Sequence, residues 1–166
     1  GIALLSRFGG GVGSSLASLG DNLGVAAIVP TGGWRIYNVQ DPMPTFDPAT
    51  YSLTIDGNVE NPVTLTWSDV QATEMVTEVS DFHCVTGWSV YDVRFRGIKA
   101  QTILDLVKPR AEAQHVNFQS LEEPYFDQLT MKQFMLPTVM LATAMDGKPL
   151  TRPHGAPMRL VIPQMY

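Results

Sequence analysis

Short segments of strand character, separated by turns and by only a few helical stretches, make up most of the chain from residue 51 onward. They combine β-branched and aromatic residues with alternating apolar and polar positions, a pattern typical of strands in a half-buried sheet. The segments expected to be strands are 52–57, 61–67, 74–80, 89–98, 115–120, 138–145 and 158–163. Because strands and helices do not alternate regularly, the pattern predicts an α+β fold rather than a doubly wound α/β fold.

Helical signals are few and local. Thr66 or Ser68 can cap a short helix that follows the second expected strand. Residues 100–108 place apolar side chains on one helical face, and Pro109 ends this helix because proline cannot continue it. A third short helix is expected within residues 129–135.

The first 33 residues differ from the rest, because glycines break their apolar runs into pieces too short to span a bilayer. The Gly-rich stretch 9–13 is not followed by Gly-Lys-Ser/Thr, and Ser14 stands where a dinucleotide-binding motif needs its third glycine. We therefore expect an N-terminal extension or linker over residues 1–33 and one domain over residues 34–166. The chain stops at Tyr166 directly after an apolar strand, so we expect this domain to be truncated at its C-terminus.

Charge and cysteine content exclude some classes of protein. The formal net charge of -5 argues against a nucleic-acid partner, which would require a basic face to neutralise phosphates. The single cysteine rules out an internal disulfide, so the fold must rest on packing. Charged residues make up 16% of the chain, below the roughly 25% of an ordinary soluble domain. Part of the surface is therefore expected to be covered by a partner, a cofactor or a membrane.

Cys84, the only cysteine, lies in the segment DFHCVTGW (81–88) and has three readings: a buried inert thiol, a nucleophile or a metal ligand. A nucleophile requires a base, but neighbours on an extended chain point to opposite faces, so His83 is badly placed for that role. A structural zinc site requires about four ligands, and the three histidines (His83, His115 and His154) show no zinc-site spacing. One thiolate does suit a metal whose other ligands come from a cofactor.

The segment RPHGAPMRLVIP (152–163) is the second candidate for chemistry. It carries Arg152, His154 and Arg159, framed by a glycine and by prolines that stiffen the backbone. Such an electropositive, rigid loop suits a phosphate or a polar heterocycle. The alternative is an ordinary turn whose arginines are solvated.

Taken together, these segments resemble a known family. The resemblance rests on three segments: HCVTGWSVYDVRFRGI (83–98), a strand that ends in Phe-Gln-Ser (118–120), and DGKPLTRPHGAPMRLVIPQMY (146–166). They look like the molybdopterin-binding catalytic domain of the sulfite oxidase family, in the bacterial branch near the methionine sulfoxide reductase catalytic subunit. The resemblance covers residues 34–166. It implies a strand-rich, mixed-sheet and barrel-like α+β fold with short helices, and a molybdenum atom held by the dithiolene of a pyranopterin.

The resemblance also implies roles for individual residues. Cys84 matches the cysteine that gives its thiolate to molybdenum, and would be both metal ligand and catalytic residue. Ser120 matches a hydroxyl residue that binds the cofactor, His154 a residue that contacts the pterin, and Arg159 the arginine that reaches its phosphate. Trp88 is expected to pack beneath the site. The further candidates for contact with the cofactor are His83, Arg35 and Tyr37.

The family's activity implies an oxidoreductase that transfers an oxygen atom to or from a small substrate. Val85 to Trp88 replace the arginine-rich segment that follows the metal cysteine in sulfite oxidase proper, so an S-oxide or N-oxide is favoured over sulfite as substrate. Electrons would come from a separate haem or quinone-linked partner, often in the membrane in relatives, because the chain has no haem or iron–sulfur motif. The resemblance places the protein outside the cytoplasm, in the periplasm or on the outer face of the membrane.

Two rivals belong to other classes. One is a non-catalytic interaction module that keeps the fold without the metal. The other is a thiol enzyme that uses Cys84 as nucleophile; it ranks last, because the sequence offers no base beyond the wrong-facing His83. Asp81 or Asp92 could orient a neighbouring group in the leading reading.

Overall fold

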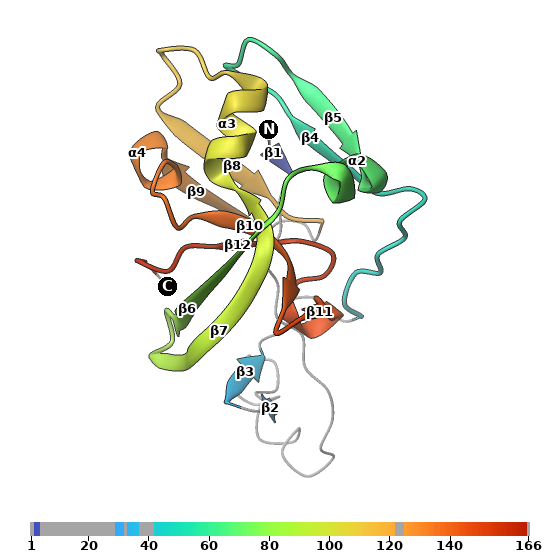
Figure 1. Cartoon of the computed structure of the whole chain (residues 1–166), viewed down its shortest axis with the longest axis vertical. Helices are drawn as coiled ribbons and strands as arrows, with labels where there is room; N and C mark the ends of the chain where they lie inside the picture. The colour runs from blue at the N-terminus through green and yellow to red at the C-terminus, as the bar shows by residue number, and fades with distance from the viewer. Residues whose placement is uncertain (1, 4–28, 32, 37–41, 122–124, 166) are drawn as a thin grey trace.

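A five-stranded antiparallel sheet forms the centre of the protein in the computed structural model, which describes residues 2–3, 29–31, 33–36, 42–121 and 125–165 (Figure 1). Its order is β11-β10-β7-β6, and β12 pairs with β10. The strands are β6 (Val76–Cys84), β7 (Trp88–Lys99), β10 (Met140–Met145), β11 (Lys148–Pro149) and β12 (Arg159–Val161). The Gly-rich stretch 9–13 and Tyr37 lie outside the described residues.

Smaller sheets flank this centre. One has the order β1-β8-β9, in which β1 runs parallel to β8, and β4 pairs with β5 and β2 with β3 as antiparallel ribbons. The strands are β1 (Ile2–Ala3), β2 (Val29–Thr31), β3 (Trp34–Ile36), β4 (Ser52–Ile55), β5 (Val63–Thr66), β8 (His115–Gln119) and β9 (Phe126–Thr130). Strands β1 and β2 thus pair with strands of the expected domain, although both fall within residues 1–33.

Helices are short, as expected. They are α2 (Trp67–Ala72), α3 (Ala100–Val107), α4 (Met131–Phe134) and the 3-10 turn η1 (Arg152–His154). The prediction of a strand-rich α+β fold with short helices is confirmed. Among the described residues no helix has the length and apolar character needed to cross a membrane.

The helix ends follow the expected signals. Thr66 caps α2: its side chain accepts a hydrogen bond from the backbone of Asp69, whose carboxylate in turn accepts from Thr66. Helix α3 ends at Val107, where Lys108 adopts a left-handed conformation with φ of 50° just before Pro109.

Two hydrophobic clusters hold the elements together. The larger packs α3 against the sheets, with Leu53, Ile98 and Phe118 among its buried members. The smaller surrounds Trp34 and Trp88 on one face of β6, β7 and β10. This smaller cluster is the packing that supports the candidate site described below.

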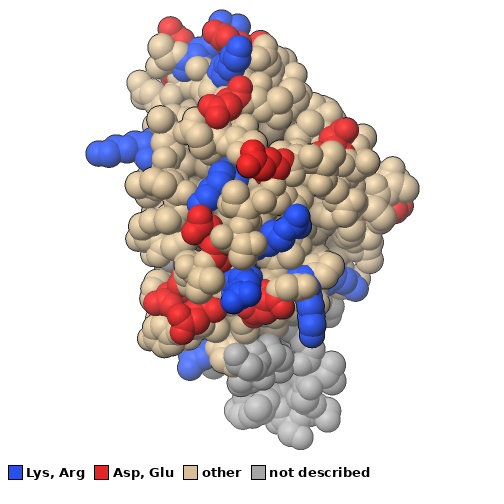
Figure 2. Space-filling view, in the orientation of Figure 1, with Lys and Arg blue, Asp and Glu red and all other residues tan. Residues whose placement is uncertain are grey.

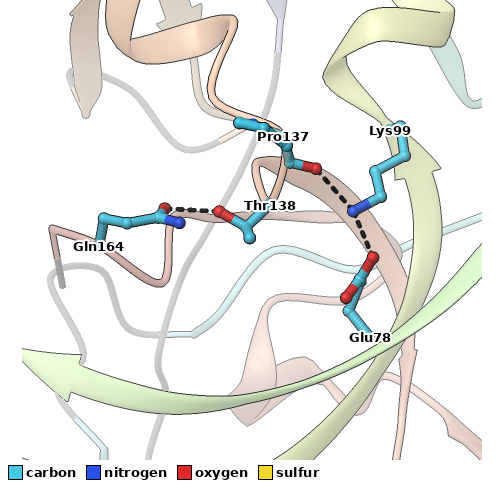
Figure 3. A network of polar contacts seen from close by, with 5 residues as sticks. All are labelled: Glu78, Lys99, Pro137, Thr138 and Gln164. Atoms are coloured by element: carbon cyan, nitrogen blue, oxygen red, sulfur yellow. Dashed lines mark hydrogen bonds and ion pairs between the residues drawn. The ribbon is translucent and has the colours of Figure 1, made fainter.

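Polar contacts tie the ends of the central strands to the loop before β10 (Figure 3). Lys99 Nζ donates to Glu78 Oε1 at 2.5 Å and to the carbonyl of Pro137 at 2.7 Å. Thr138 Oγ1 donates to Gln164 Oε1 at 2.5 Å. Elsewhere on the face seen in Figure 2, positive and negative side chains are interspersed.

Gly97 lies where two strands approach each other closely. It lies on β7 and pairs with Val76 on β6 and with Ala142 on β10. A Cβ atom built on Gly97 would lie 2.0 Å from the carbonyl oxygen of Leu141 and 2.5 Å from Cα of Ala142. Only glycine therefore permits this spacing of β7 and β10.

Tyr51 gives a prediction about alkaline stability. Its half-buried ring packs edge-on against Phe46 and Trp67, with centroids 5.6 and 5.5 Å away, and burial raises the pKa of Tyr51 to about 12. The folded state favours the neutral phenol. The stability that this burial contributes is therefore fully present below the unfolded-state pKa of 10.0 and is lost as the pH rises toward 12. We expect this loss to reach about 2 kcal/mol.

Tyr51→Phe isolates the contribution of that phenol. Urea unfolding at pH 8 and at pH 11 gives the free energy of unfolding of the wild type and of the variant. The wild type should lose more stability than the variant between these two values of pH. Equal losses would show that Tyr51 does not titrate in this range.

Five strands (β1, β2, β3, β9 and β11) were not predicted, and one helix boundary differs from expectation. Strand β9 was not predicted, because only Leu129 of its residues is buried and the segment lacks clear alternation. The expected helix over 129–135 is only the four residues of α4, since Leu129 and Thr130 belong to β9.

Candidate functional site

Cys84 is the last residue of β6, at the turn that leads into β7. It pairs with Trp88, and the N–H of Gly87 closes the turn by donating to the carbonyl of Cys84 at 2.8 Å. Gly87 has a φ of +84°, which favours glycine at this position. The thiol is partly buried, and its Sγ lies 3.3 Å from Oγ1 of Thr86. The hairpin thus holds a single thiol in a defined place.

His83 faces away from the buried side of the hairpin. It is exposed, whereas Phe82 before it is buried, in keeping with strand alternation. Its Nδ1 lies 2.7 Å from Oγ of Ser89, the residue opposite in the register. The described contacts therefore place His83 with Ser89 rather than with the Cys84 thiol.

Arg159, on β12, is a charged side chain inside the protein. It is 1% exposed, and its guanidinium carbon lies 4.8, 5.8 and 5.9 Å from the ring centroids of Phe82, Trp34 and Phe95. Aromatic faces attract a cation, so these rings offset part of the cost of burying the charge. The guanidinium is held in a fixed position by this aromatic cage.

The electrostatics of Arg159 favour an anionic ligand. Burial lowers the pKa of Arg159 to about 9, against an opposite and smaller effect of Cys84 and Tyr125, whose negative charges would raise it. The guanidinium therefore stays charged at neutral pH, but its charge is poorly solvated. An anion bound there would supply the compensation that water cannot.

His154, at the end of η1, lies beside this cage. Its carbonyl oxygen accepts a hydrogen bond from Nη1 of Arg159 at 3.4 Å, and its ring meets Trp34 edge-on at 4.9 Å. Burial, and then the charge of Arg159, lower the pKa of His154, so its imidazole is neutral at neutral pH. Among the described residues, neither its buried Nδ1 nor the buried Nε1 of Trp88 has a hydrogen-bond partner. Both atoms are available to a polar ligand.

Ser120 lies close to the same region. It is 5% exposed at the end of β8, and its N–H donates to the carbonyl of Tyr125 at 3.0 Å. Tyr125 is near enough to Arg159 for its charge to act there. The structure thus brings together Cys84, Ser120 and the segment that holds His154 and Arg159, three separate parts of the chain.

Other candidates lie elsewhere or remain undescribed. Arg35 is exposed on β3, on the opposite side of that strand from buried Trp34. Tyr37 lies outside the described residues. Asp81 Oδ1 accepts a hydrogen bond from the N–H of Asp92 at 3.0 Å, where the β6–β7 register shifts, so these two acids hold the bulge.

The aromatic cage is the part of the site that sequence reasoning missed. Trp34, Phe82 and Phe95 come from β3, β6 and β7, and only the folded sheet brings them together. One signal was present: Arg159 stands inside the apolar run MRLVIP, where a charge has to be buried.

The available residues fit a cofactor that brings its own metal ligands. Within the described parts of the chain, no group of three or more His, Cys, Asp or Glu side chains is arranged to hold a metal ion. One partly buried thiol, a buried guanidinium and two unused buried N–H or N sites instead match a metal bound to an anionic, heterocyclic cofactor.

Comparison with known proteins agrees with this donor set. The family described as "Oxidoreductase molybdopterin binding domain" matches residues 40–166. An uncharacterized oxidoreductase YuiH of Bacillus subtilis is 36% identical over 120 residues, which are 72% of this chain and 60% of that protein. The protein-methionine-sulfoxide reductase catalytic subunit MsrP of Campylobacter jejuni is 30% identical over 73% of this chain and 46% of its own length. MsrP of Gluconobacter oxydans is also 30% identical, over 74% of this chain and 44% of its own length.

A solved structure shares the fold. The sulfane dehydrogenase SoxCD of Paracoccus pantotrophus superposes with a TM-score of 0.68 at 20% identity, over 77% of this chain and 36% of that one. The chain thus spans about half the length of the curated relatives it matches.

Proposed function

Because this chain belongs to the oxidoreductase molybdopterin-binding domain family, we propose that it binds a molybdenum–pyranopterin cofactor between Cys84, His154 and Arg159 and supports oxygen-atom transfer on a small S-oxide or N-oxide. The observation that carries the proposal is the buried Arg159 guanidinium in its aromatic cage, on the same side of the sheet as the single thiol. MsrP relatives, named as methionine-sulfoxide reductases, favour reduction of an S-oxide over oxidation of sulfite.

Each residue has a distinct part in holding the cofactor. The Cys84 thiolate would be the protein ligand of the metal, kept in place by the hairpin turn. Arg159 would bind the cofactor's phosphate through charge-assisted hydrogen bonds. His154 would donate or accept at Nδ1 toward a polar pterin atom, and Ser120 would contribute from the end of β8. His83, Arg35 and Tyr37 remain weaker candidates for contact with the cofactor.

The chemistry divides between cofactor and protein. When bound, the molybdenum pterin supplies a two-electron redox centre that exchanges an oxygen atom with the substrate. The protein fixes the thiol, neutralises the anionic cofactor and excludes water through the Trp34, Phe82 and Trp88 rings. We further propose that a separate haem or quinone-linked protein, in or at a membrane, delivers the electrons. We also propose that the protein acts outside the cytoplasm and that the domain holding the site spans residues 34–166.

Metal analysis of Cys84→Ser tests the proposal. The full-length protein is produced in a host that makes the pterin cofactor, and molybdenum and pterin are measured separately. The wild type should hold near-stoichiometric molybdenum. The methionine-sulfoxide reductase activity of the variant should be lower by at least about a hundredfold, which corresponds to about 3 kcal/mol of transition-state stabilisation. Its molybdenum content or spectrum should change as well.

Ser68→Ala, an exposed change on α2, serves as the control and should match the wild type. A wild-type protein that folds but takes up neither metal nor pterin would favour the non-catalytic module instead. Full activity in Cys84→Ser would rule out the thiol as the metal ligand.

A further inference from the structure

A cavity lies on the face of the central sheet opposite the candidate site. Side chains alternate along β7, so Phe95 points into the aromatic cage while Arg94 and Arg96 are exposed on the other face. Arg94 and Arg96 line a cavity of about 340 Å³ between α2, β7, β10 and β11, where β10 has a bulge. This volume suits one small organic molecule.

The cavity is positively charged and lacks an internal counterion. Lys148 lines it together with Arg94 and Arg96. In the parts of the chain that the structure describes, no carboxylate is within ion-pair distance of these three cations. By contrast, Lys99 on the same strand is paired with Glu78 at 2.5 Å. The three unpaired cations therefore present their charge to whatever enters the cavity.

The guanidinium of Arg96, a strong hydrogen-bond donor, is bonded to a weak acceptor. Its Nη1 donates to Sδ of Met75 at 3.2 Å, and a thioether sulfur accepts hydrogen bonds only weakly. A carboxylate in place of that sulfur would form shorter, charge-assisted and bidentate hydrogen bonds with the guanidinium. The side chain is thus already directed into the cavity without being satisfied there.

The rest of the lining combines apolar side chains, chiefly Trp67 and Met75, with the polar residues Gln71, Thr77 and Thr143. Trp67 packs edge-on against Phe46 and Tyr51, and it begins the capped helix α2. The hydroxyl of buried Thr143 donates to the Met75 sulfur at 3.6 Å. An aromatic ring or short apolar body could pack between Trp67 and Met75, whereas a small hydrated ion would leave these walls uncovered.

We propose that this cavity is a binding site for a small organic carboxylate with an apolar or aromatic body. Arg94 and Arg96 bind the carboxylate, Lys148 adds charge, and the Trp67 and Met75 side chains cover the apolar body. The site is independent of the cysteine and its cofactor, because it occupies the other face of β7.

Benzoate is the probe, titrated calorimetrically into the full-length protein, while NMR follows the indole N–H of Trp67. Benzoate should bind, shift the Trp67 resonance and bind at least tenfold more tightly than acetate or inorganic phosphate. Affinity should fall with added salt, since charge attraction is screened. The double variant Arg94→Gln with Arg96→Gln should bind benzoate at least tenfold more weakly than the wild type.

Arg110→Gln is the matched control, because Arg110 is an exposed arginine that does not line this cavity. It should bind benzoate as the wild type does. Thermal unfolding confirms that the double variant is folded; should it not be, Arg96→Lys replaces it, and its lost guanidinium fork should still weaken benzoate severalfold. Equal affinity in wild type and variant, an unmoved Trp67 resonance, or phosphate binding as tight as benzoate would each overturn the proposal.

Discussion

Gly97→Ala is expected to destabilise the protein by about 3 kcal/mol or more. The new methyl group would meet the backbone of Leu141 and Ala142, at 2.0 Å from the Leu141 oxygen. Backbone atoms cannot rotate away as a side chain can, so β10 would have to move away from β7. That movement would disturb the strand that carries both β11 and β12 as partners.

Gly57→Ala is the matched control for this change. Gly57 has a φ of +95°, but apart from its two chain neighbours no described residue has an atom within 4 Å of a Cβ built there. It should cost only about 1 kcal/mol, from backbone conformation alone. Urea unfolding of both variants separates the two effects, and equal losses would mean that β7 and β10 are not as close as described.

Arg159→Met is expected to separate cofactor binding from stability. Cofactor content should fall at least tenfold, because the phosphate would lose a buried, charge-assisted partner. The cofactor-free protein should lose no more than about 1 kcal/mol, and can gain stability, because an apolar side chain of similar size replaces a buried charge among aromatic rings. Molybdenum and pterin content and cofactor-free urea unfolding are the two measurements.

Arg110→Met makes the same chemical change at an exposed position and should retain the cofactor. A cofactor-free Arg159→Met protein that is strongly destabilised would show that the arginine holds the fold together. Unchanged cofactor content would show that another group binds the phosphate.

Local patterns in the sequence were enough to predict most elements of the fold. The alternation in β6, the apolar face of α3 and the Thr66 cap each arise from residues that are neighbours in the chain. Strand β9 escaped prediction, since its polar residues are made a strand by pairing with β8. The close approach at Gly97 was equally invisible, because it depends on where β10 lies.

The candidate site was predictable only in part. Cys84 and the segment 152–163 stood out by their residue types, and the resemblance assigned them roles. The aromatic cage around Arg159 and the partnership of His83 with Ser89 depend on pairing between strands. The cationic cavity was missed for the same reason, because Arg94, Arg96 and Lys148 meet only once β7, β10 and β11 are assembled.

The pairing of β12 with β10 also sets the order in which the site can form during folding. The hairpin that holds Cys84 is local, so it can close early at little cost in chain entropy. Arg159 arrives only when β12, at the far end of the described chain, docks on β10, which itself must first find β7. A partly folded chain thus presents the thiol without the guanidinium. An anionic cofactor would therefore bind stably only after β12 has joined the sheet.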